Sequence, residues 1–190
     1  MNSPYKNKFK VTQIYKGSLH DGLDLVGLSD KKIYSTIDGT VERAGWENAS
    51  NKRQGFGLYV RIKQNGSADR YYFGHLSKVN VKVGQTVKKG DILGTEGSTG
   101  YSTGSHCHYC VRKNASKSEL KDVSKISGIP NKLGTYTNTV ATAPAYYLVK
   151  KSWKNVLVYR TKYISQAKIV AKKYGYVVYD EKGKTIYSFR

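Results

Sequence analysis

Short apolar runs separated by glycines dominate the chain from about Tyr5 to Arg112. β-Branched and aromatic residues make up these runs, which include segments 31–35, 39–44, 58–62 and 71–75. The spacing of three and four residues that marks a long amphipathic helix is not found there. In segment 81–94, apolar side chains alternate with turn glycines, as they do where antiparallel strands are joined tightly. The pattern therefore predicts a mostly β domain built from antiparallel sheet.

The pattern changes near the C-terminus, after a polar stretch that follows Arg112. Residues 134–144 form a Thr-rich segment that ends in a proline, which is typical of a linker. We therefore interpret residues 1–133 as the β domain, residues 134–144 as the linker and residues 145–190 as a small second module.

The pattern within this module predicts an α+β arrangement. Two apolar runs, 146–149 and 156–159, precede apolar residues at helical spacing in segment 164–174, and Gly175 follows as a C-terminal cap. Two further runs within residues 176–189 would pair as a hairpin. The expected order of elements is β-β-α-β-β.

Charge narrows the range of partners. The 190 residues include 33 Lys and Arg against 13 Asp and Glu, and so basic a surface favours nucleic acid, anionic lipid or the bacterial cell wall. Residues 145–190 hold eleven of these basic residues, two of the acidic ones and eight of the 17 tyrosines. This module suits anionic wall polymers and stacking on sugars, but the same composition fits single-stranded nucleic acid.

The sequence shows no targeting signal and has few cysteines. A membrane-spanning helix needs about 18 consecutive apolar residues, and no apolar run in the sequence approaches that length. The N-terminal residues also contain no apolar stretch of signal-peptide length. We therefore expect no membrane span, no signal peptide and synthesis in the cytoplasm. Cys107 and Cys110 are the only cysteines, so no disulfide framework holds the fold. We expect a monomer.

The four histidines have a spacing that suits metal chemistry. His20 and Asp24 are four residues apart, His106 and His108 are two apart, and His75 stands alone. Residues two or four apart on a strand point to the same face, so each pair could converge on one ion. Two imidazoles and one carboxylate suit Zn²⁺, and the two remaining histidines could serve hydrolysis. The spacing alone leaves open that these are ordinary surface or core histidines.

The full set of motifs resembles the lysostaphin/LytM-type zinc endopeptidases of peptidoglycan over roughly residues 15–112. The first motif, His-x-Gly-x-Asp, is found at residues 20–24, and the middle His-Leu-Ser signature lies within residues 73–77. A run of valines and glycines follows at residues 81–100, and the closing Ser-Thr-Gly-x-His-x-His motif spans residues 102–108.

The resemblance implies roles for five residues. His20, Asp24 and His108 would hold zinc. His106 would be the general base, and His75 would orient the attacking water or stabilise the oxyanion. The implied reaction is hydrolysis of an amide bond in the peptide part of peptidoglycan by zinc-activated water.

Three neighbouring residues need separate interpretation. On a continuing strand Cys107 faces away from His108 into the core, whereas Cys110 shares the face of His108, and we expect both to be packing residues. A zinc site made only of residues 106, 107, 108 and 110 is disfavoured, because one strand cannot surround an ion tetrahedrally. Asp21 could fix the tautomer of His20, but as a strand neighbour it would point the other way, so we expect it in solvent.

Residues 127–136 and the C-terminal module, residues 145–190, resemble the linkers and wall-targeting modules of lysins from phages of Gram-positive bacteria. The preferred hypothesis is therefore a phage-type endolysin that is made in the cytoplasm and acts on the wall at lysis. One alternative is an inactive scaffold of the same fold that binds the wall without cutting. Another is a basic nucleic-acid-binding protein, which leaves the pattern of histidines to chance; we do not expect nucleic acid as a partner.

Overall fold

The computed structural model describes residues 1–138, 147–150, 157–161, 164–174, 176–179 and 184–188. The chain forms two compact units, Met1–Val140 and Ala141–Arg190. Each unit has its own hydrophobic core.

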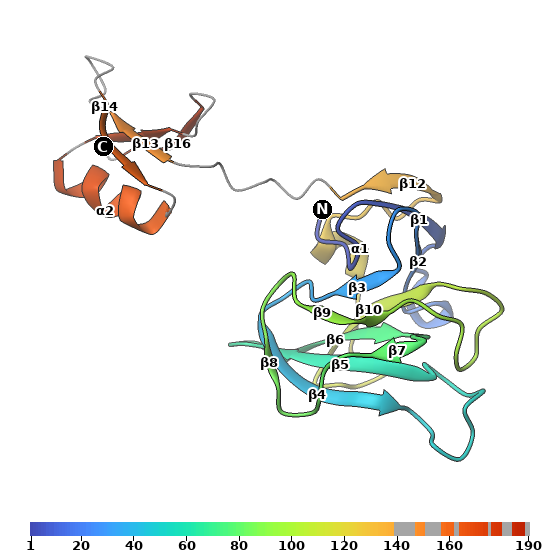
Figure 1. Ribbon diagram of the computed structural model, residues 1–190. Coiled ribbons are helices and arrows are strands. Elements are labelled where there is room, and N and C mark those ends of the chain that lie inside the picture. The colour runs from blue at the N-terminus through green and yellow to red at the C-terminus, as the bar shows by residue number, and fades with distance from the viewer. Residues whose placement is uncertain (139–146, 151–156, 162–163, 175, 180–183, 189–190) are drawn as a thin grey trace. The chain divides into compact units, whose positions relative to one another are not determined.

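The first unit is almost entirely β-structure, as the sequence predicts (Figure 1). Its strands are β1 (Lys8–Gln13), β2 (Gly22–Gly27), β3 (Lys32–Tyr34), β4 (Gly39–Trp46), β5 (Leu58–Gln64), β6 (Asp69–Gly74), β7 (Lys78–Val79), β8 (Thr86–Val87), β9 (Ile92–Thr95), β10 (Cys107–Lys113), β11 (Leu120–Lys121) and β12 (Gly134–Thr137). One turn of 3-10 helix, η1 (Gly17–Leu19), precedes β2, and the short helix α1 (Val123–Ser127) follows β11.

One large antiparallel sheet organises this unit. Its strand order is β12-β1-β2-β10-β6-β5-β4-β8, with β11 paired to β10 beside this path. Strands β4, β5 and β6 run side by side in Figure 1. A smaller sheet has the order β3-β9-β7. Because β10 lies between β2 and β6, it is a central strand, and six of its seven residues are buried.

The two faces of strand β10 have different surroundings. Cys107 and Tyr109 belong to the main hydrophobic core, which also contains Leu25 of β2. The alternate residue His108 is paired with Asp24 of β2. This alternation presents polar side chains on one face of the sheet while the other face packs in the core.

The first residues of the predicted linker belong to the first unit. Residues 134–137, assigned to the linker from the sequence, form strand β12, which pairs with β1 from Lys8 to Val11. The alternating Thr and Tyr residues of this segment suit a strand, and Tyr136 packs on Phe9 with ring centroids 6.1 Å apart. The first unit therefore includes these residues, and residues 139–144 of the predicted linker lie outside the described residues.

Helix α1 is an element that the sequence interpretation did not include. The Asp122 side chain accepts a hydrogen bond from the Ser124 backbone N–H at its start, and Gly128 ends it in the left-handed conformation. Both are ordinary helix boundary signals.

The second unit contains the elements predicted from its pattern. Strands β13 (Tyr147–Lys150), β14 (Leu157–Thr161), β15 (Val177–Tyr179) and β16 (Thr185–Ser188) form a sheet of order β14-β13-β15-β16. Helix α2 (Ile164–Tyr174) places Ala167 and Ala171 in a core with Val149 and Val178. The predicted cap Gly175 and turn 180–183 lie outside the described residues.

A membrane-spanning helix was not expected from the sequence. Among the residues that the structure describes, no helix is long and apolar enough to cross a membrane.

Candidate metal centre

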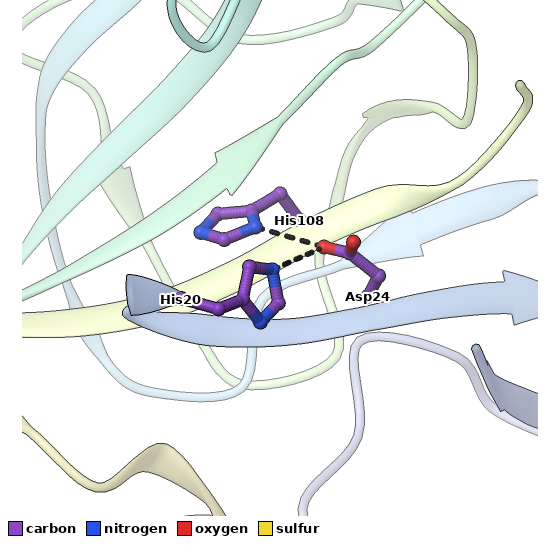
Figure 2. A group of neighbouring side chains, drawn as sticks. All are labelled: His20, Asp24 and His108. Atoms are coloured by element: carbon purple, nitrogen blue, oxygen red, sulfur yellow. Dashed lines mark hydrogen bonds and ion pairs between the residues drawn. The ribbon is translucent and has the colours of Figure 1, made fainter. Parts of the chain in front are cut away.

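Two imidazoles lie against one carboxylate in the first unit. The Oδ1 atom of Asp24 lies 2.8 Å from Nδ1 of His108 and 3.2 Å from Nε2 of His20. Figure 2 shows both rings directed at this oxygen. One ligand atom from each of the three residues lies within 4.8 Å of those of the other two. The three predicted metal ligands therefore form one cluster.

His20 reaches this cluster from outside a strand. It follows η1 and precedes β2, and its backbone carbonyl accepts a hydrogen bond from Lys16 N–H. The predicted proximity of His20 and Asp24 is correct, although both residues were expected on one strand. The turn at residues 16–20, rather than strand alternation, directs the His20 ring at Asp24.

Hydrogen bonds at the far side of each ring fix the nitrogen that faces the cluster. Nδ1 of His20 lies 2.7 Å from the Ile14 carbonyl oxygen, which can only accept, so this nitrogen carries the proton. Nε2 of His108 lies 3.1 Å from Oδ1 of Asp21. The remaining nitrogens, Nε2 of His20 and Nδ1 of His108, face Asp24 and are the atoms that would offer lone pairs to an ion.

The charges of the cluster also fit a cation. Burial raises the pKa of Asp24, but hydrogen bonds from His108 and His20 outweigh this effect and hold the pKa well below its ordinary value. Burial lowers the pKa of His108, whereas its bonds to Asp21 and Asp24 raise it well above the ordinary value in the metal-free chain. The cluster thus combines an ionised carboxylate with two imidazoles, and two nitrogens and one oxygen suit a divalent transition-metal ion.

The two other histidines adjoin this cluster. His75 and His106 have ring centroids 4.7 Å apart, and Nε2 of His106 lies 3.6 Å from Oδ1 of Asp24. Nδ1 of His106 donates to the Gly104 carbonyl oxygen at 2.8 Å, and Nδ1 of His75 donates to that of Thr99 at 2.7 Å. In the neutral rings, Nε2 of both residues is therefore a hydrogen-bond acceptor.

His75 has an unusual environment. Its backbone φ is +61°, a conformation that side-chain-bearing residues seldom adopt. Burial lowers the pKa of His75 to about 4, an effect that the Thr99 hydrogen bond only partly offsets. His75 is consequently a neutral imidazole at pH 7.

A cleft of about 480 Å³ opens above the cluster. All four histidines and Asp24 line it, together with exposed side chains such as Leu19 and Tyr101, which are 87% and 85% exposed. The structure thus brings the five predicted site residues to one open cleft. Their individual roles stay predictions.

Among the residues next to the site, Asp21 lies elsewhere than the sequence predicts, whereas Cys107 and Cys110 are packing residues as expected. Asp21 does not point to solvent: its side chain is 16% exposed and contacts His108 and Arg112. It precedes β2, so strand alternation does not apply to it. Cys107 is buried in the core, and Cys110 packs with Tyr59 and Tyr72. Sequence reasoning missed Arg112, although it shares the alternation of His108 along β10.

Three side chains that could hold a metal ion, in an open cleft with two further imidazoles, form an arrangement typical of metal-dependent hydrolases. The sequence profile of peptidase family M23 matches residues 18–120, more than half of the chain. The chain belongs to peptidase family M23.

Two relatives and one solved structure illustrate this membership. Lysostaphin of Staphylococcus simulans is 36% identical over 130 residues, which make up 66% of this chain and 25% of lysostaphin. Glycyl-glycine endopeptidase ALE-1 of Staphylococcus capitis is 40% identical over 93 residues, or 49% of this chain and 24% of that protein. The structure of the catalytic domain of lysostaphin from S. simulans aligns with a TM-score of 0.53 and 33% identity, covering 65% of this chain and 92% of that domain.

This likeness confirms the mostly β, lysostaphin-like fold. The chain spans only about a quarter of the length of the two relatives.

Proposed function

We propose that the chain is a zinc endopeptidase that hydrolyses an amide bond in the peptide part of bacterial peptidoglycan. The observation that carries this proposal is the convergence of His20 Nε2 and His108 Nδ1 on one oxygen of Asp24, beneath an open cleft. Membership of family M23 and the likeness to two staphylococcal peptidases support the reaction class.

His20, Asp24 and His108 would hold the zinc ion, because two nitrogens and one oxygen are donors that it accepts and leave a further position open. When bound, zinc acts as a Lewis acid that makes water a nucleophile near neutral pH and polarises the scissile carbonyl.

His106 serves as the general base. Its Nδ1–H bond to Gly104 leaves Nε2 free to accept a proton from the attacking water. The resulting imidazolium lies beside the carboxylate of Asp24, which stabilises it. The same nitrogen can then return the proton to the amine that leaves.

His75 orients the water. As a neutral ring whose Nδ1–H is bonded to Thr99, it accepts a hydrogen bond through Nε2 and cannot donate one to an oxyanion. Of the two roles that the resemblance implies for His75, the tautomer favours the first.

The decisive experiment joins metal content with clearing of a Gram-positive wall suspension, before and after chelation. We expect about one zinc per chain, loss of clearing on chelation and recovery with added zinc. His108→Ala should lose zinc and activity together, whereas His106→Ala should lose activity and keep most of its zinc. Equal zinc loss in both variants would mean that the roles of ligand and base are confused.

The result also separates the proposal from its main rival. Stoichiometric zinc, without cleavage of walls or of a panel of soluble wall peptides, would indicate a binding-only scaffold. A chain that binds no zinc would refute the mechanism.

We further propose that residues 145–190 bind anionic polymers of the wall. Helix α2 presents Lys168, Lys172 and Lys173 to solvent beside Ile169, which is 68% exposed, and it contains no acidic residue. Such a surface attracts polyanions and offers an apolar contact beside them.

Sedimentation with purified walls tests this role. Lys168→Glu with Lys172→Glu should weaken binding, and Lys78→Glu with Lys82→Glu, the same charge change on exposed residues of the first unit, should weaken it less. Walls stripped of anionic polymers should bind the chain weakly. Unchanged binding to stripped walls, or tighter binding to single-stranded nucleic acid, would contradict the assignment.

The cellular context that we propose is a phage-type endolysin, made in the cytoplasm and released at lysis. A wall-hydrolysing unit joined to a small basic unit suits that role. Expression in a Gram-positive host should be tolerated until a pore-forming protein is co-expressed, and only then should the culture lyse. Lysis without the pore would refute the proposed route.

A further inference from the structure

A chain of buried polar contacts leads away from the metal centre on the side opposite Asp24. Nε2 of His108 lies 3.1 Å from Oδ1 of Asp21. The other carboxylate oxygen of Asp21 accepts two hydrogen bonds from Arg112, from Nε at 2.8 Å and from Nη2 at 2.6 Å. The three side chains are only 8 to 16% exposed. Both carboxylate oxygens of Asp21 are therefore engaged.

Aromatic rings hold the arginine in this network. The Arg112 guanidinium lies 4.9 Å from the ring centre of Tyr72 and 5.1 Å from that of Phe56. Phe56 also contacts the ring of His108, with centroids 5.6 Å apart. Stacking on two rings and two hydrogen bonds to a carboxylate restrict a guanidinium more than one ion pair would. Arg112 is thus a fixed support for Asp21.

We propose that Asp21 and Arg112 are positioning residues that hold His108 in the orientation needed to bind the metal ion. Asp21 keeps the proton of the ring on Nε2, so the lone pair of Nδ1 would face an ion bound beside Asp24. Arg112 holds the Asp21 carboxylate in place by occupying its second oxygen. This inference rests on the proposed zinc site and extends it outward by two residues.

The same region could be interpreted as a second cation site. Asp21, His108 and Cys110 each offer a ligand atom within 4.8 Å of the other two. However, the guanidinium of Arg112 already neutralises Asp21 at 2.6 Å and would repel a cation placed there. The network therefore favours one bound ion per chain, with Asp21 as a hydrogen-bond acceptor and not as a ligand.

The test measures zinc affinity by competition with a chromophoric chelator, using the full chain. Asp21→Ala removes the acceptor and should weaken zinc binding roughly 10- to 100-fold. Asp21→Asn keeps one side-chain oxygen that can accept from Nε2–H, but its amide nitrogen cannot accept from Arg112, so it should recover only part of the affinity that Asp21→Ala loses. Arg112→Lys, which loses the paired hydrogen bonds of the guanidinium, should fall between the wild type and Asp21→Ala.

Asp69→Asn is the matched control. Asp69 is a similarly buried carboxylate of the same sheet, and it forms an ion pair with Lys121 at 2.6 Å, away from the three metal ligands. Its replacement should alter stability without altering zinc affinity. The absorption spectrum of the Co²⁺-substituted chain gives a second readout, since tilting His108 changes the ligand field while a purely structural role would leave the spectrum unchanged.

Three results would overturn the inference. Wild-type zinc affinity in folded Asp21→Ala would show that His108 needs no such support. Equal losses in Asp21→Ala and Asp69→Asn would indicate general destabilisation. Two ions per wild-type chain would make Asp21 a ligand. If neither the wild type nor any variant binds zinc, the proposed function fails along with the inference, and that pattern is distinct from the other three.

Discussion

Replacing Glu96 by glutamine should destabilise the first unit, because this buried carboxylate joins three separate segments. Its Oε2 accepts hydrogen bonds from the Tyr5 hydroxyl at 2.5 Å and from Gly27 N–H at 2.8 Å. Its Oε1 accepts from Lys31 Nζ at 2.7 Å and from the Ser105 hydroxyl at 2.6 Å. The glutamate side chain is completely buried, and Ser105 directly precedes the proposed general base.

The expected loss follows from the chemistry of an amide in this position. In its better orientation, the amide oxygen introduced by Glu96→Gln still accepts from Gly27 and Tyr5, and the amide nitrogen donates to the Ser105 hydroxyl. Lys31 then turns to water, at small cost because its side chain is already 50% exposed. Three charge-assisted hydrogen bonds become neutral ones, which should cost about 2 kcal/mol in total.

Urea unfolding followed by circular dichroism measures this loss in the metal-free chain. Lys31→Met is the control, and it should cost less than about 1 kcal/mol because the ion pair is half exposed. A Glu96→Gln variant as stable as the wild type would refute the reasoning. A Lys31→Met variant that loses as much would show that the ion pair, rather than the buried hydrogen bonds, stabilises the fold.

The effect also has a defined pH dependence. Burial raises the pKa of Glu96, but the bonds from Lys31, Ser105 and Tyr5 outweigh it and lower the pKa below its ordinary value of 4.5. A lowered folded pKa contributes stability above the unfolded value, and this contribution is lost as the pH falls through the folded pKa. The stability difference between wild type and Glu96→Gln should therefore be constant above pH 4.5 and shrink below it.

Two further predictions concern the metal centre. Gly22→Ala should lose both zinc and stability, because a Cβ atom there would lie 2.7 Å from Nε2 of His108 and 2.7 Å from the Tyr109 carbonyl oxygen. A wild-type zinc content in this variant would contradict the steric argument. Zinc affinity should rise with pH, by up to about tenfold per unit, until the pH passes the raised pKa of His108, because binding displaces that proton. Chelator competition across a pH series checks this, and a flat profile would contradict it.

The fold was largely predictable because local patterns and final packing agree in most segments. The strands near residues 31–35, 39–44, 58–62 and 71–75 formed where short β-branched and aromatic runs predicted them. β12 was mistaken for linker because its pairing with β1 joins Lys8 to Thr137, a relation that no local pattern reveals. Helix α1 has only five residues, which are too few to show a helical period. Its only signals in the sequence are the capping residues Asp122 and Gly128.

The residues of the site could be predicted from the sequence, but the hydrogen-bond partners that orient them could not. His106 and His108 could be paired from spacing, and the family resemblance supplied the role of each histidine. The tautomers could not be predicted, because they depend on backbone carbonyls such as those of Ile14 and Thr99, which are distant in sequence or placed by turns. Sequence spacing locates a side chain, whereas its proton is placed by neighbours that only the fold brings near.

Strand β10 shows that one of these orienting residues, Arg112, could have been predicted from the sequence. Counting from His106, every second residue contributes to the site or its surroundings: His108 faces the metal centre, Cys110 packs beside it and Arg112 holds Asp21. The residues between them belong to the core. A register slip of one residue would exchange these two sets and remove the site, so the same alternation that buries β10 also fixes its chemistry. Continuing that alternation past His108 predicts the position of Arg112, but its partner Asp21 lies outside any strand and follows only from the folded chain.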